Sequence, residues 1–125
     1  MNQFRKPGWR GVALSFLHAL RGVMCLLARQ RHARFHALAG IATVLLGFLL
    51  HVSRLEWAAL LICIGLVFAA ESLNTAIEEL ADALHPGTHP GIGRAKDVAA
   101  AGVLFTAIIA AMIGALIFLP KLFAR

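Results

Sequence analysis

The fold is decided by the stretch from residue 57 to residue 82, which reads WAALLICIGLVFAAESLNTAIEELAD. Its first part, Trp57–Ala70, contains no Asp, Glu, Lys or Arg, whereas the part that follows is rich in acids. Good helix formers continue without Gly or Pro up to Pro86, which favours one helix of about 30 residues and roughly 45 Å. We therefore predict a helix over residues 55–84 that crosses a bilayer and protrudes from it.

The composition of the whole chain excludes an ordinary soluble domain. Of its 125 residues, 60% are hydrophobic and 14% are charged, and a chain of this length cannot bury so much apolar surface within itself. Two further charge-free stretches, Phe35–Ser53 and Val98–Pro120, are long enough to cross a bilayer. The sequence thus predicts an all-α integral membrane protein with transmembrane helices at 33–52, 55–84 and 95–119.

The N-terminal region predicts a helix of a different kind, over residues 9–31. Apolar residues recur there at helical spacing, and the opposite side gathers Arg10, His18, Arg21 and Arg29. Such a helix lies along a membrane surface, and a packed helix with one solvated side is the alternative. The complete prediction is a single domain over residues 1–125, with three transmembrane helices and an N-terminal amphipathic interfacial helix.

The basic residues predict how the chain is oriented. With the N-terminus in the cytoplasm, nine Lys and Arg residues lie on the cytoplasmic side and three lie on the other side, as the positive-inside rule requires. The segment 85–93, rich in Pro and Gly, is then a cytoplasmic loop. The net charge of +6 suits an anionic bilayer; a nucleic-acid partner is excluded because it would need a polar surface with stacking side chains.

Four polar side chains form a stripe along the long helix. Glu71, Asn74, Glu78 and Asp82 are separated by three, four and four residues, which keeps them within about 80° of one another around the helix axis. Glu71 falls inside the apolar layer, where a carboxylate costs about 3 kcal/mol and is a candidate for function. A hydrogen bond between helices is the alternative explanation. Glu79 points away from the stripe, so we expect it to be a solvated charge.

Lys96 and Asp97 lie directly after the loop, in the first turn of the third span. Free backbone N–H groups at a helix start attract phosphate oxygens. As an alternative, Asp97 caps the helix and Lys96 extends to the lipid headgroups. Combined with the stripe, Lys96 predicts a phosphoryl-transfer site, with Mg²⁺ on carboxylates, phosphate on the Lys and a deeper carboxylate as base.

Several known motifs are absent from the sequence. There is no GxxxxGK[ST] segment, and the Gly-rich stretch does not follow a strand, so the ATP site is neither a P-loop nor a Rossmann site. The chain contains no HExxH or GxSxG motif. Cys25 and Cys63 have no metal-binding spacing and are expected to be buried thiols.

The segments ESLNTAIEELAD (residues 71–82) and AKDVAAAGV (residues 95–103) resemble the paired signature of the prokaryotic diacylglycerol kinase family, which includes undecaprenol kinases. Further matches at Ser15, Gly22 and residues 33–36 extend the resemblance over nearly the whole chain. The resemblance implies a homotrimer in the bacterial inner membrane whose active sites are shared between subunits. It also implies transfer of the γ-phosphate of ATP to a membrane lipid alcohol.

The same resemblance implies roles for individual residues. Glu71 corresponds to the catalytic base, Asn74 to an active-site residue and Glu78 to a metal ligand. The positions that correspond to ATP contacts are Glu78, His89, Lys96, Asp97 and, from the N-terminal helix, Arg10. One position departs from the family: Gln30 stands where a second metal-binding Glu is usual, and an amide ligates Mg²⁺ without supplying charge. Asp82 or Glu79 is then a candidate accessory acid.

The sequence therefore predicts an ATP- and Mg²⁺-dependent lipid kinase that converts diacylglycerol to phosphatidic acid, with undecaprenol as the alternative acceptor. Two rivals belong to other classes. A small proton-coupled transporter would have four spans and a lone buried carboxylate. A non-enzymatic subunit of a membrane assembly would become the better explanation if Gln30 removed metal binding.

Overall fold

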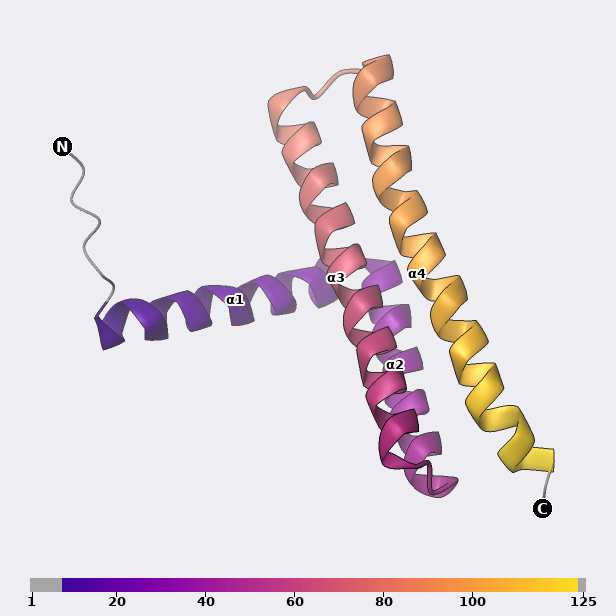
Figure 1. Ribbon diagram of the computed structural model, residues 1–125. Helices are drawn as coiled ribbons and strands as arrows, with labels where there is room; N and C mark the ends of the chain where they lie inside the picture. Colours follow the sequence, from indigo (N-terminus) through magenta and orange to yellow (C-terminus); the bar gives the residue numbers. More distant parts are fainter. Residues whose placement is uncertain (1–7, 124–125) are drawn as a thin grey trace.

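The computed structural model describes residues 8–123, apart from the side chain of Arg10. These residues form four α-helices and no strand: α1 Trp9–Arg29, α2 Arg31–Leu49, α3 Arg54–Leu84 and α4 Pro90–Phe123. The two long helices α3 and α4 make an antiparallel hairpin, and α2 lies beside the N-terminal half of α3. Helix α1 is transverse to them and extends away to one side, with only its C-terminal end near α3 (Figure 1). By length and composition, all four helices could cross a membrane.

The buried core lies at one end of the hairpin, where α2 turns into α3 and α4 ends. It consists of a small cluster with partly buried neighbours: Leu50, Val52, Leu60 and Phe118, with Leu46, Trp57 and Ile117 around them. Most other large apolar side chains are exposed on the isolated chain. Such a surface suits contact with lipid or with further subunits rather than with water.

A close approach between α2 and α3 depends on Gly47. A Cβ atom at this position would lie 2.6 Å from Cη2 of Trp57, and the Trp57 ring also packs against Phe48 with 4.9 Å between the ring centroids. The glycine therefore makes room for the indole at the edge of the core.

The turn from α2 to α3 is a Schellman motif with a histidine in the left-handed position. His51 has a φ of 50°, its N–H donates to the carbonyl of Phe48 at 3.3 Å, and the N–H of Val52 donates to that of Gly47 at 3.1 Å. Glycine usually occupies this position because it carries no Cβ. The motif satisfies carbonyl groups that the last turn of α2 would otherwise leave unpaired.

The start of α3 is tied to the end of α4 by a small polar network. Ser53 and Glu56 form a capping box: the N–H of Ser53 donates to Glu56 Oε2 at 2.6 Å, and the N–H of Glu56 donates to Ser53 Oγ at 3.3 Å. Lys121 of α4 places its Nζ 3.1 Å from the same Glu56 oxygen. The fourth helix reaches Lys121 because it continues through Pro120 to Phe123.

The fourth helix starts earlier than the sequence indicated. The sequence predicts a loop up to residue 93 and a span from residue 95, but α4 begins at Pro90. The prediction that Lys96 and Asp97 lie in the first turn beside free N–H groups is therefore wrong, because both residues lie beyond that turn. Proline is favourable in the first helical position, where its missing N–H would have had no partner. The imidazole Nδ1 of His89 accepts the N–H of Gly91 at 3.1 Å and so caps the helix.

A single residue joins α1 to α2. Gln30 has extended backbone angles, with φ −99° and ψ 116°, and ends α1 while starting α2. Its N–H donates to the carbonyl of Leu26 at 2.9 Å. The chain thus changes direction at Gln30, and α1 leaves the bundle sideways (Figure 1).

Candidate active site

The predicted polar stripe lies on one uninterrupted helix. Because α3 runs from Arg54 to Leu84, the spacing of Glu71, Asn74, Glu78 and Asp82 does place them along one side of it. Glu71 is only 3% exposed, Asn74 and Glu78 are partly buried, and Asp82 is exposed near the end of the helix. The stripe therefore leads from the surface of the chain to a buried carboxylate.

Asn74 and Glu78 are joined by a hydrogen bond within the stripe. The amide Nδ2 of Asn74 donates to Glu78 Oε1 at 3.1 Å, which orients both side chains. The other end of the amide, Asn74 Oδ1, is buried and has no hydrogen-bond partner. An unpaired buried acceptor costs about 1–3 kcal/mol, so this oxygen is available to a ligand.

Lys96 connects α4 to the outer end of the stripe. Its Nζ lies 2.5 Å from Asp82 Oδ1, across the two arms of the hairpin. Lys96 is partly buried, whereas Asp97 beside it is exposed. The structure thus brings Lys96 and Asp82 together and places the neighbouring Asp97 on the outside of the same turn.

Two of the predicted nucleotide contacts lie away from the stripe. His89 caps α4, and its ring packs edge-on against His85 with 5.6 Å between centroids; it precedes Lys96 by about 10 Å of helix. The side chain of Arg10 lies outside the described residues. Its position on the first turn of α1 is about 30 Å along the helix from Arg29, at the end far from α3 (Figure 1).

Glu79, for which the sequence predicts only a solvated charge, faces the corner between α1 and α2. Glu79 is about half exposed, and its Oε1 lies 3.7 Å from Nη1 of Arg29. Gln30, the position at which the family's second Glu is missing, directly follows this arginine. The pairing of Arg29 with Glu79 depends on the direction that α1 takes, which residue spacing does not specify.

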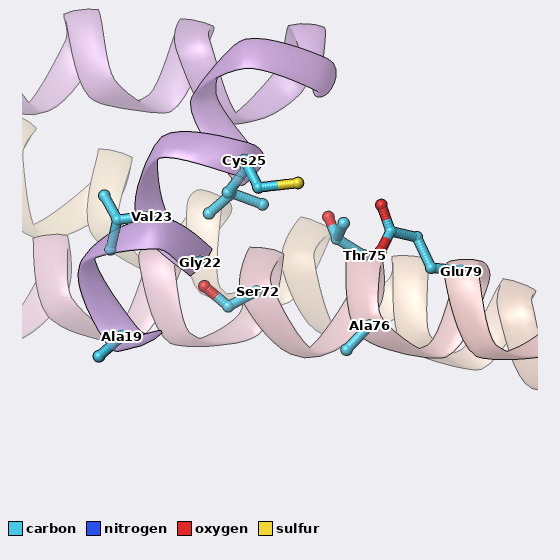
Figure 2. Close-up of a pocket in the computed structure, with 9 residues that line it drawn as sticks. Ala19, Gly22, Val23, Cys25, Ser72, Thr75, Ala76 and Glu79 are labelled. Atoms are coloured by element: carbon cyan, nitrogen blue, oxygen red, sulfur yellow. The ribbon is translucent and has the colours of Figure 1, made fainter. Parts of the chain in front are cut away.

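A pocket of about 380 Å³ lies between α1 and α3. Gly22 and Cys25 line it from α1, and Ser72, Thr75 and Glu79 line it from α3 (Figure 2). The prediction that Cys25 is buried is wrong, because α1 extends away from the bundle and leaves this thiol exposed, while Cys63 is buried as expected. Sequence analysis did not find this pocket.

Thr75 differs from the other hydroxyl residues within the described helices. Four of them donate to the carbonyl four residues earlier, at 2.8–3.0 Å: Ser15, Thr43, Ser72 and Thr106. Thr75 is 8% exposed, and its Oγ1 is buried with no hydrogen-bond partner. The one available signal in the sequence is that Thr75 follows Glu71 by one helical turn.

Within the described residues, no three His, Cys, Asp or Glu side chains cluster closely enough to hold a metal ion on their own. Mg²⁺ at phosphoryl-transfer sites is commonly held by one or two carboxylates together with phosphate oxygens of the substrate. The oxygens of Glu78 and the unpaired Asn74 Oδ1 are ligands of the kind that Mg²⁺ prefers. The residues present therefore fit this metal.

Comparison with known proteins identifies the family. The family model described as prokaryotic diacylglycerol kinase matches residues 17–118. The chain is 44% identical over 108 residues to an undecaprenol kinase of Bacillus subtilis, covering 86% of this chain and 88% of the relative. It is 35% identical over 122 residues to a diacylglycerol kinase of Synechocystis, covering 94% of this chain and 70% of the relative.

The chain belongs to the prokaryotic diacylglycerol kinase family. It is accordingly a lipid kinase with ATP as phosphate donor. Its apolar helices and this family membership make it a multi-pass membrane protein. These findings confirm the predicted family and the predicted class of enzyme, and they disfavour both the transporter and the non-enzymatic subunit.

Proposed function

We propose that this lipid kinase transfers the γ-phosphate of ATP to diacylglycerol and so forms phosphatidic acid. Undecaprenol is the second candidate acceptor, and it is favoured by the 44% identity to an undecaprenol kinase. Both lipids present one primary hydroxyl at the membrane interface. The observation that carries the proposal is the burial of Glu71 on the same side of α3 as Asn74 and Glu78.

Glu71 acts as the general base in this proposal. Its carboxylate accepts the proton of the lipid hydroxyl while the alcohol oxygen attacks the γ-phosphorus. A site withdrawn from water favours this role, because water would otherwise compete with the lipid as acceptor. Burial of Glu71 to 3% exposure supports such a site.

Glu78 and Asn74 would hold Mg²⁺ together with ATP. When bound, the metal neutralises charge on the phosphate oxygens. The hydrogen bond of Asn74 to Glu78 orients the carboxylate, and Asn74 Oδ1 has no hydrogen-bond partner within the chain. Gln30 would supply at most a neutral oxygen from the corner between α1 and α2, and Asp82 is the accessory acid nearest the cytoplasmic end of the stripe.

Lys96, Asp97, His89 and Arg10 would contact the nucleotide. The ion pair with Asp82 holds Lys96 Nζ at the mouth of the stripe, where a positive charge can stabilise the phosphoryl group in transfer. Arg10 lies far from the stripe of its own chain, so it would contact ATP bound to a neighbouring subunit. This separation supports a homotrimer with shared active sites.

In the membrane, α2, α3 and α4 would span the bilayer while α1 lies on its cytoplasmic surface. The transverse direction of α1 and the arginines on one of its sides support this arrangement. The single domain over residues 1–125 would then sit in the inner membrane with a cytoplasmic N-terminus, and the basic residues of α1 would face anionic headgroups.

The acceptor can be identified with purified protein in mixed micelles, using ATP labelled in the γ-phosphate and one lipid at a time. We expect Mg²⁺-dependent label in diacylglycerol. Label in undecaprenol alone would replace diacylglycerol as the acceptor, and no label in any lipid alcohol would overturn the proposed reaction. Protein with Glu71→Gln, tested in the same micelles, controls for contaminating kinases.

A further inference from the structure

The pocket between α1 and α3 contains a polar group that the fold leaves unused. Thr75 Oγ1 is buried without a partner, although Ser72 in the same pocket donates to its own helix at 2.8 Å. Buried hydroxyl groups almost always find a hydrogen-bond partner, because leaving one unpaired is costly. The hydroxyl of Thr75 is therefore available to a ligand that supplies a partner.

The surroundings of Thr75 indicate what kind of ligand this is. Much of the pocket is lined by small or apolar side chains, among them Gly22, Val23 and Ala76. Figure 2 shows Thr75 extending from α3 on the side where Cys25 of α1 lies. A ligand with one polar atom at the end of an alkyl chain fits such a lining, whereas a nucleotide would leave many polar groups unpaired.

We propose that Thr75 binds the reacting hydroxyl of the lipid acceptor and holds its oxygen beside Glu71. This inference rests on the proposed function, since it requires Glu71 as the base. Residues four apart on a helix have Cβ atoms about 5–6 Å apart, so one oxygen can contact both side chains. Thr75 donates to the alcohol oxygen and keeps its own proton. The proton of the alcohol passes to Glu71 as the new O–P bond forms and the bond from the γ-phosphorus to the β–γ bridging oxygen breaks.

The decisive variants are Thr75→Val, which has nearly the same shape but no hydroxyl, and Thr75→Ser, which keeps the hydroxyl. We expect Thr75→Val to lower kcat/KM for the lipid by about three- to tenfold, the effect of losing one neutral hydrogen bond, with the KM for ATP unchanged. Thr75→Ser should restore most of the lost activity. Thr106→Val is the matched control, because that hydroxyl already bonds to carbonyls of its own helix.

Two further measurements separate acceptor binding from a structural role. A merely structural hydroxyl would lower the thermal midpoint when removed, whereas replacing an unpaired buried hydroxyl should leave the midpoint of Thr75→Val unchanged or raise it. With diacylglycerol, dialkylglycerol and undecaprenol as separate acceptors, the loss should be equal, because only the hydroxyl is common to all three. Loss confined to diacylglycerol would move the contact to its ester groups and overturn the proposal.

The proposal also fails if Thr75→Val and Thr106→Val have the same kcat/KM as the unsubstituted protein. The assignment of Glu71 fails by a different result, namely full turnover in Glu71→Gln. The two failures are therefore distinguishable in one set of assays.

Discussion

The two ends of the α3–α4 hairpin differ in whether their polar side chains have partners within the chain. At the end near the core, Glu56 accepts from the Ser53 N–H and from Lys121, so that one carboxylate closes a local network. Toward the other end, Asn74 Oδ1 and Thr75 Oγ1 are buried without partners. Lys96 and Asp82 also form an ion pair at that end, but the carboxylate of Asp82 is exposed.

This difference separates residues that stabilise the fold from residues that are available to a substrate. Hydrogen bonds that are already made contribute to stability, whereas buried polar atoms without partners reduce it. Proteins retain such atoms mainly where function requires them. Substitutions at the two ends should consequently affect different measurements.

The largest expected effect comes from exchanging one acid at each end for its amide. Glu71→Gln should lower kcat by about 10²–10⁴, the usual contribution of a general base, without changing the thermal midpoint much. Glu56→Gln should retain activity and lower the thermal midpoint, because it weakens both the capping box and the contact with Lys121. Lipid phosphorylation and thermal unfolding in the same detergent measure both effects. Activity of Glu71→Gln equal to that of the unsubstituted protein would contradict the assignment.

The two paired lysines provide the second comparison. Lys96→Met should reduce kcat by about 10²–10³, as expected when one charge that stabilises the transferred phosphoryl group is removed. Lys121→Met has the same change of side chain at the other end and should reduce only the thermal midpoint. Equal activity in the two variants would show that the charge of Lys96 serves the ion pair with Asp82 alone.

The third comparison tests how tightly the core end is packed. Gly47→Ala should destabilise the protein, because the new Cβ lies 2.6 Å from the Trp57 ring and overpacking of this kind costs about 1–3 kcal/mol. The better helix propensity of Ala returns up to about 1 kcal/mol. Gly65→Ala is the control, since nothing lies within 4 Å of its added Cβ, and it should be neutral or stabilising. If both variants unfold at the same temperature, the close approach at Gly47 is not a constraint.

The smallest effect is expected at the corner between α1 and α2. Gln30→Glu should reduce the Mg²⁺ concentration needed for half-maximal activity about threefold, because a carboxylate oxygen binds Mg²⁺ better than an amide oxygen. A titration of activity against Mg²⁺ at fixed ATP measures this shift. An unchanged titration curve would place residue 30 outside the metal site.

The stripe could be predicted because its geometry is local. On one helix, spacings of three and four residues determine which side chains share a side, whatever the rest of the chain does. The distance of Glu71 along the helix predicts that it lies inside the apolar layer of the membrane; its burial within the chain depends on the helices that pack around it. Lys96 was expected near the stripe because both flank the same short loop, and its contact with Asp82 follows from the antiparallel hairpin.

Other parts of the site depend on information that spacing does not contain. The contact between Arg29 and Glu79 and the pocket beside Thr75 both depend on how α1 crosses α3. Helical threonines commonly bond to their own backbone, so apart from its place one turn after Glu71 the sequence does not distinguish Thr75 from Thr43 or Thr106. The early start of α4 does not follow from composition, because Pro and Gly are typical of loops and the cap that His89 provides depends on the local backbone.

The junction at Gln30 also determines how α1 can move. Two backbone torsions, φ and ψ of this one residue, set the angle between α1 and α2. Both lie in an ordinary extended region, so the bend stores no strain. Rotation about these torsions would move α1 as a rigid helix and carry the residues that line the pocket from α1 away from α3. The polar contacts broken by this movement would be those of Gln30 and Arg29. The width of the pocket thus depends on the angle of a single hinge.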